Sequence, residues 1–142
     1  MNTAGGKRER AFELRISSDP ANLAAARKAV ESFALDCALG QRASHDLGLC
    51  LNEVLANIMR HAYGGRTDRP IVITAEPGER ELTVRVRDWG NGIDPTTIRH
   101  EPYNPLTPGG VGLICLTELL DRIIYTPQPD GMLATMVKKR KG

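Results

Sequence analysis

The stretch DLGLCLNEVLANIMRHAYGG, residues 46–65, decides the fold of this chain. Its apolar residues recur at helical spacing and predict an amphipathic helix with one buried face: Leu47, Leu51, Val54, Leu55, Ile58 and Ala62. Gly64 and Gly65 predict the end of this helix, because glycine readily adopts the left-handed conformation in which helices terminate. We therefore expect the rest of the chain to pack around this helix, which begins near Ser44.

A second stripe of the same helix is polar. It carries Glu53 and Asn57, which are four residues apart, and it continues through Arg60 and His61. A carboxylate can accept a proton, and a carboxamide oxygen can bind a hard cation such as Mg²⁺. Two polar residues on a solvated helix face are the commoner explanation of such a pair. The sequence of this helix alone therefore favours the interpretation that Glu53 and Asn57 lie on a solvated face.

The length and composition predict one globular domain. The chain has 142 residues, of which 41% are hydrophobic and 25% charged, and we expect a flexible tail over residues 1–10 and a single domain over 11–142. A net charge of +2 is too small to indicate nucleic acid as a direct partner. Isolated cysteines and the lack of a membrane-length apolar run predict a cytoplasmic protein without membrane contact.

Alternating and helical patterns outline the remaining elements. Strands are predicted at residues 12–16, 71–75, 81–88, 123–126 and 133–137. A helix should begin at Asp19-Pro20 and stop near Gly40, and another should open at residues 109–113. Tight turns at Pro77-Gly78 and at 129–131 join neighbouring strands. The fold class is therefore α/β (α+β): a two-layer sandwich with a mixed, mostly antiparallel sheet and helices on one face.

Asp88 is the least expected residue of the strand at 81–88. It falls on the same side of the strand as the apolar residues Leu82, Val84 and Val86. A carboxylate in a row that faces the core is costly unless it is paired. A buried ion pair satisfies it, and so does a ligand that donates a hydrogen bond. The glycine turn at 89–93 follows directly, and there the backbone can approach a ligand closely.

The segment from residue 94 to residue 108 is irregular and holds four prolines. A connection of this length is more often a functional lid than an inert linker. The glycine-rich start of the next helix has free backbone amides, which suit a phosphate group.

Three motifs resemble the asparagine box and the two glycine boxes of the Bergerat ATP-binding fold: Glu53–Asn57, Asp88–Ile93 and Gly110–Leu113. They occur in the family's order and on a predicted helix, strand-turn and loop-helix. The likeness extends from residue 12 to residue 137. The short lid, the stand-alone length and the wording of residues 52–63 look most like the bacterial anti-sigma factor serine kinases.

The resemblance implies ATP and Mg²⁺ as cofactors. It implies that Glu53 is the catalytic general base, that Asn57 is the metal ligand, and that Asp88 accepts a hydrogen bond from the adenine amino group. The other candidate cofactor-binding residues are Arg60, His61, Gly90, Gly92, Ile93, Gly110, Val111, Gly112 and Leu113.

The function implied is that of a serine/threonine protein kinase. Its substrate would be a STAS-domain anti-sigma factor antagonist, and it would regulate a sigma factor by partner switching, as a homodimer. The lid at 101–110 lacks the lysine or arginine that family members often place near the terminal phosphate, so Arg60, Arg99 or His100 would have to serve. A non-catalytic ATP-gated protein-binding module and a detached histidine-kinase catalytic domain are the alternatives.

Other residues carry weaker expectations. A structural role is commoner for His61 than a phosphate contact. Trp89 is expected either to flank the adenine or to cover the edge of the core. The free thiols of Cys50 and Cys115 are expected to be small buried hydrophobic groups. The basic residues 138–141 are expected to form a solubilising end of the chain rather than a nucleic-acid arm.

Overall fold

A single sheet forms the rear layer of the molecule. The computed structural model describes residues 11–91 and 112–140, apart from the side chains of residues 112–115. Its strands are β1 (Phe12–Ser17), β2 (Pro70–Pro77), β3 (Glu81–Asp88), β4 (Arg122–Gln128) and β5 (Gly131–Lys139). They lie in the order β1-β2-β3-β5-β4, and each pair of neighbours is antiparallel. The predicted two-layer, mostly antiparallel fold is therefore confirmed.

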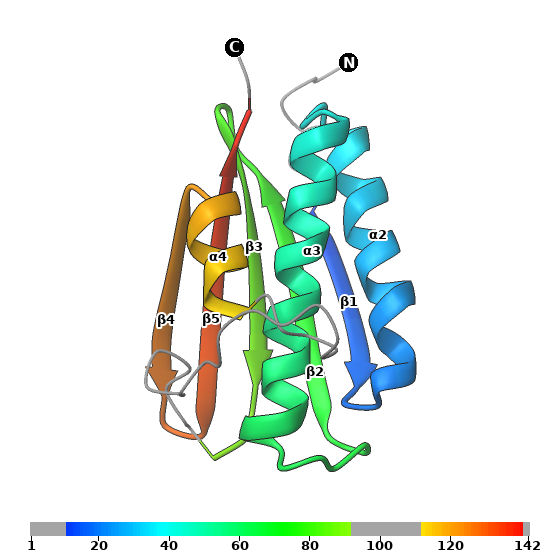
Figure 1. Cartoon of the computed structure of the whole chain (residues 1–142), viewed down its shortest axis with the longest axis vertical. Coiled ribbons are helices and arrows are strands. Elements are labelled where there is room, and N and C mark those ends of the chain that lie inside the picture. Colours follow the sequence, from blue (N-terminus) through cyan, green and yellow to red (C-terminus); the bar gives the residue numbers. More distant parts are fainter. Residues whose placement is uncertain (1–10, 92–111, 141–142) are drawn as a thin grey trace.

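The helices form the front layer. They are the short 3₁₀ helix η1 (Pro20–Asn22), α2 (Leu23–Asp36), α3 (Gln41–Asn57), the π-helical turn η2 (Ile58–Ala62) and α4 (Gly112–Leu119). Figure 1 shows α2, α3 and α4 on one face of the sheet, with α3 between the other two. None of the helices in the described part of the chain is long and apolar enough to cross a membrane.

The central helix α3 has the buried face that its sequence predicts. All six residues of the predicted apolar stripe are buried: Leu47, Leu51, Val54, Leu55, Ile58 and Ala62. The helix begins at Gln41, three residues earlier than expected, after Gly40 with a φ of 96°. Gly64 and Gly65 end the segment with φ angles of 59° and 85°, the left-handed region that favours glycine. The core of the domain therefore lies between α3 and the sheet.

The strand β3 places Asp88 where the alternation predicts it. Leu82, Val84 and Val86 are fully buried, and Asp88 at the end of the same row is 2% exposed. In the sheet, Asp88 lies opposite Ile71 of β2 and Met132 of β5. The last residue of the central strand β3 therefore places a carboxylate on the face of the sheet that the helices cover.

The expectation for the basic end of the chain is wrong for two of its residues. The Lys138 ammonium donates a hydrogen bond to the carbonyl of Leu119 at 2.5 Å and lies 3.8 Å from the Asp46 carboxylate. The Arg140 guanidinium donates to the carbonyl of Cys37 at 3.1–3.2 Å. These side chains fasten the end of β5 to the helical layer and do not only increase solubility.

Candidate nucleotide-binding site

The polar stripe of α3 is buried. Glu53 is 2% exposed and Asn57 is 5% exposed, although both are polar and one carries an ionisable carboxyl group. The solvated helix face is therefore the wrong explanation of this pair. Burying polar groups costs free energy unless they have hydrogen-bond partners. A buried carboxylate and a buried carboxamide therefore need such partners, in the protein or in a ligand.

Asn57 has one satisfied and one unsatisfied amide atom. Its Oδ1 accepts a hydrogen bond from Arg60 Nη2 at 3.1 Å, which brings a cation to this end of the helix. Its Nδ2 is buried and has no hydrogen-bond partner within the described residues. A buried donor without a partner destabilises the fold by about 1–3 kcal/mol, which a ligand with an acceptor group would relieve. The Asn57 amide nitrogen is therefore a buried donor that suits a ligand with an acceptor group.

Asp88 is held at the rim of the strand layer by its own turn. Its Oδ1 accepts a hydrogen bond from the backbone N–H of Gly90 at 2.9 Å. In the described residues no ion pair involves this carboxylate. Burial raises the pKa of Asp88 above its usual value, and the Gly90 hydrogen bond and the Arg87 charge oppose that rise in part. The group is a desolvated acceptor, which suits recognition of an amino group.

The turn after Asp88 packs directly on the end of the helical segment. The backbone N–H of Asn91 donates to the carbonyl of Ala62 at 3.1 Å, and Trp89 N–H donates to the Tyr63 hydroxyl at 2.7 Å. Figure 1 shows the ends of α3 and β3 meeting at the same lower edge of the molecule. The structure therefore brings the helix that carries Glu53 and Asn57 to the strand end that carries Asp88.

Trp89 directly follows the central strand β3. Its side chain is 40% exposed, and the Arg87 guanidinium carbon lies 4.5 Å from the centre of its ring. Arg87 also forms an ion pair with Asp130 at 2.7 Å in the turn before β5. These contacts place the Trp89 ring over Arg87 at the surface, and the two expected roles of Trp89 both stay predictions.

The remaining predicted site residues are only partly described. His61 is half-buried in η2 beside Arg60. Gly112 and Leu113 form the first turn of α4, as the glycine-rich helix start predicts, but their side-chain surroundings are not described. Gly92, Ile93, Gly110 and Val111 lie outside the described residues, as do Arg99 and His100.

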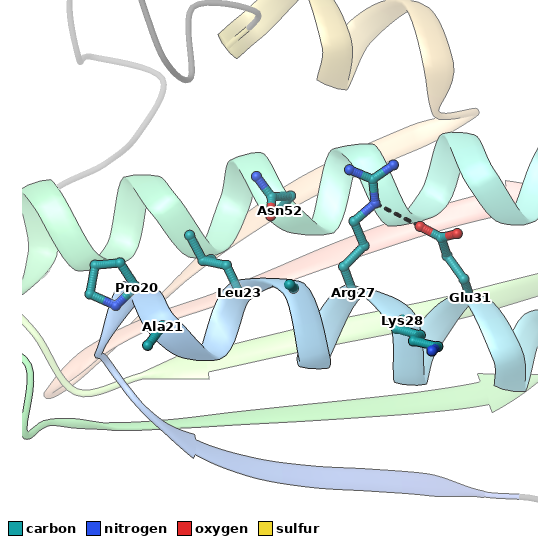
Figure 2. Close-up of a pocket in the computed structure, with 8 residues that line it drawn as sticks. Pro20, Ala21, Leu23, Arg27, Lys28, Glu31 and Asn52 are labelled. Carbon is teal, nitrogen blue, oxygen red and sulfur yellow. Dashed lines mark hydrogen bonds and ion pairs between the residues drawn. The ribbon is translucent and has the colours of Figure 1, made fainter.

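A separate pocket of about 450 Å³ lies between α2 and α3. Figure 2 shows its lining residues on η1, α2 and α3, and the Arg27 guanidinium donates to the Glu31 carboxylate at 2.7 Å. Asn52 lines this pocket, whereas its neighbour Glu53 is buried, because consecutive helix residues point in different directions. The pocket contains neither Asn57 nor Asp88 and is distinct from the candidate nucleotide site.

Gly90→Ala should destabilise the domain by about 1–3 kcal/mol, because an added methyl group would overpack the junction between turn and helix. A Cβ at this position would lie 2.6 Å from the carbonyl oxygen of Ala62 and 2.7 Å from its Cβ, and backbone atoms cannot move aside easily. Denaturant unfolding measures the change.

Gly48→Ala in the middle of α3 is the matched control. There the three atoms nearest to an added Cβ all belong to the Glu31 side chain, within 2.6 Å, and this side chain can move aside at the cost of its partly exposed ion pair with Arg27. Alanine is preferred over glycine in helices by about 1 kcal/mol, so stability should stay the same or rise. If both variants unfold at the same denaturant concentration as the native protein, the close packing at Gly90 is not important for stability.

The fold is that expected of a Bergerat-type ATP-binding domain. Residues 16–138 match the family described as the histidine kinase-like ATPase domain, and the chain belongs to this family. Because the match covers most of the chain, the described site lies within the family's domain.

Two curated relatives agree with this assignment. The serine-protein kinase RsbW of Listeria innocua is 27% identical over 134 residues, which cover 88% of this chain and 84% of that protein. The anti-sigma F factor of Clostridium novyi is 25% identical over 135 residues, with coverage of 92% and 94%. The predicted resemblance to anti-sigma factor serine kinases is confirmed.

One similar solved structure contains the RsbU and RsbW domains of a Mycobacterium tuberculosis protein. It superposes with a TM-score of 0.67 at 15% identity, over 93% of this chain and 33% of that longer chain. At this identity the likeness is one of fold.

Proposed function

We propose that this chain is an ATP-dependent protein kinase that phosphorylates a serine or threonine of a STAS-type anti-sigma factor antagonist and so regulates a sigma factor by partner switching. The names of the curated relatives support this class of enzyme. The observation that carries the proposal is the Asp88 carboxylate, which is 2% exposed at the end of β3 and is followed by a turn that bonds to Ala62, at the end of the helical segment that holds Asn57.

The described residues fit Mg-ATP as a ligand. Asp88 supplies a desolvated acceptor for the adenine amino group. Asn57 supplies an amide oxygen of the kind that Mg²⁺ binds, and an Nδ2 donor that has no partner within the described residues. Arg60 lies 3.1 Å from the Asn57 amide oxygen and supplies positive charge near the phosphates. ATP bound in this site supplies the phosphoryl group that is transferred.

Glu53 has the position and the chemistry of a general base. It lies one helical turn before Asn57 and is almost fully buried, so its carboxylate works in a water-poor environment. In the proposed reaction Glu53 accepts the proton of the attacking serine or threonine hydroxyl. Such a proton acceptor accelerates a reaction by about 10²–10⁴-fold.

Incubation with ATP labelled at the terminal phosphate tests the proposed activity. The full chain is mixed with a STAS-domain protein encoded near it in the genome, and the label is followed on both proteins. We expect acid-stable label on a hydroxyl group of the STAS protein. Acid-labile label on a histidine would support the detached histidine-kinase domain, and unlabelled protein with bound ATP would contradict the kinase.

A second candidate function is an ATP-gated binding module that transfers no phosphate. The absence of lysine and arginine from residues 101–110 favours it, because a cation near the transferred phosphate stabilises the transition state. In this case ATP would only control the capture of the sigma factor. For either function we expect a cytoplasmic homodimer, which analytical ultracentrifugation of the full chain would test.

A further inference from the structure

We propose that Tyr63 is a positioning residue that fixes the Asp88 carboxylate and thereby sets the selectivity of the site for purines with a 6-amino group. This inference rests on the proposed nucleotide site and adds Tyr63 to it, a residue whose hydroxyl group alone positions Asp88. Tyr63 follows η2 directly and precedes Gly64.

The Tyr63 hydroxyl makes two hydrogen bonds that join three segments. It donates to the carbonyl of Pro70 at 2.6 Å and accepts from the backbone N–H of Trp89 at 2.7 Å. In the sheet Ile71 lies opposite Asp88, so Pro70 and Trp89 are the next residues outward on their two strands. The hydroxyl therefore links the helical layer to both strands one residue from the carboxylate.

Neighbouring contacts make the position of the turn depend on the same helix end. Ala62 accepts a hydrogen bond from Asn91 at 3.1 Å and leaves no room for a side chain at Gly90. Gly90 in turn donates to Asp88 Oδ1 at 2.9 Å. The carboxylate is thus oriented by a turn that Ala62 and Tyr63 hold on both sides of Gly90.

The ring and the hydroxyl group of Tyr63 have separate roles. The side chain is 7% exposed, and the ring belongs to the hydrophobic core, a task that phenylalanine would also perform. Removing the hydroxyl would leave the Trp89 N–H and the Pro70 carbonyl without this partner. Because buried polar groups without partners are costly, we expect the Trp89 N–H and the Pro70 carbonyl to form other hydrogen bonds. These new bonds would shift the segment that carries Asp88.

The same turn also connects the two halves of the site. Only five residues separate Asn57 from Tyr63, and these residues form η2, a π-helical turn of a kind that occurs frequently at functional sites. A rigid link of this kind places the metal-binding amide and the purine-binding carboxylate in a fixed relation.

Tyr63→Phe tests the inference by nucleotide selectivity. ATP and purine riboside triphosphate, which has hydrogen in place of the 6-amino group, are titrated into the native and variant full chains with magnesium. We expect the native protein to prefer ATP and Tyr63→Phe to lower that preference by about 5- to 10-fold, through weaker ATP binding, with less than about 2-fold change for the analogue. Tyr125→Phe on edge strand β4, the matched control, should keep the native preference.

The outcomes separate the inference from the function on which it rests. Equal weakening of both nucleotides, or an unchanged preference, would overturn the positioning role of Tyr63 while leaving the ATP site intact. A native chain that binds neither nucleotide would overturn the proposed function itself. If Tyr63→Phe is partly unfolded at 25 °C, the titrations are repeated at about 10–15 °C, near the usual maximum of protein stability.

Discussion

Glu53→Gln is expected to slow phosphoryl transfer to the partner protein by about 10²–10⁴-fold, the usual contribution of a general base. Glutamine keeps the size and the hydrogen-bonding oxygen of the side chain, which is 2% exposed, but it cannot accept the proton. Because the substitution leaves Asn57 and Asp88 unchanged, ATP affinity should change by less than about 3-fold. Single-turnover transfer of labelled phosphate measures the rate.

Glu76→Gln is the matched control for this experiment. Its carboxylate is exposed on β2 and lies 3.5 Å from Arg85, a surface ion pair of the kind that contributes at most about 1 kcal/mol. Transfer should therefore stay at the native rate. Native transfer by Glu53→Gln would show that this carboxylate is not the base. If the native protein transfers no phosphate and Glu53→Gln still captures the sigma factor in an ATP-dependent manner, the binding module is favoured.

Asp88→Asn is expected to weaken ATP binding by about 10- to 100-fold, the loss of one hydrogen bond to a charged group. Asparagine retains an oxygen that can accept from Gly90, but its amide nitrogen would face the adenine amino group with a donor instead of an acceptor. Displacement of a fluorescent ATP analogue measures the affinity. Asp68→Asn, at an exposed surface ion pair, is the control and should bind as the native chain does.

Asp88→Asn should also make the nucleotide-free protein more stable at neutral pH, because asparagine carries no carboxylate that must be buried in its charged form. Burial raises the pKa of Asp88 from its usual value of 3.8, so between that value and the raised pKa the folded state holds a proton that the unfolded state releases. Stability is therefore lost as the pH rises through this window, and the loss persists above it. Asparagine has no ionisable carboxyl group, so the variant does not lose stability in this way.

Denaturant unfolding at a series of pH values tests this account of Asp88. The stability difference between Asp88→Asn and the native protein should be near zero below pH about 4 and should increase toward pH 7. A difference that stays constant across this range would mean that the carboxylate is not desolvated in the folded protein.

Much of the fold could be predicted from the sequence because its signals are local. The alternation of β3 places Asp88 in the core-facing row, and the helical period of α3 identifies its buried face. Gly64 and Gly65 are informative because few other residues adopt their positive φ angles. These features depend on neighbours in the sequence and need no knowledge of the tertiary structure.

The burial of the polar pair could not be predicted from the helix alone. A carboxylate and a carboxamide one turn apart have the same pattern on a solvated face and in a ligand site. The family resemblance supplied the functional interpretation, and the exposed fractions of 2% for Glu53 and 5% for Asn57 then excluded the solvated face.

The hydrogen bonds that Tyr63 makes to Pro70 and Trp89 also could not be predicted from the sequence. Its hydroxyl contacts Pro70 and Trp89, which lie 7 and 26 residues away, and such pairings arise only when the strands assemble. The π-helical turn η2 leaves no distinct pattern, because it widens one turn of an otherwise regular helix. The structural roles of Lys138 and Arg140 were missed for the same reason, since their partners are distant in the chain.

The most direct test of the central claim, that Asp88 is buried at the end of β3 to recognise a purine, is calorimetric titration of ATP. The native chain and Asp88→Asn are each titrated with and without magnesium. We expect the native chain to bind one ATP per protomer, more tightly with magnesium, and Asp88→Asn to bind at least about 10-fold more weakly in both conditions. Equal affinities of the two proteins, or a native chain that produces no binding heat and does not displace a fluorescent analogue, would contradict the claim.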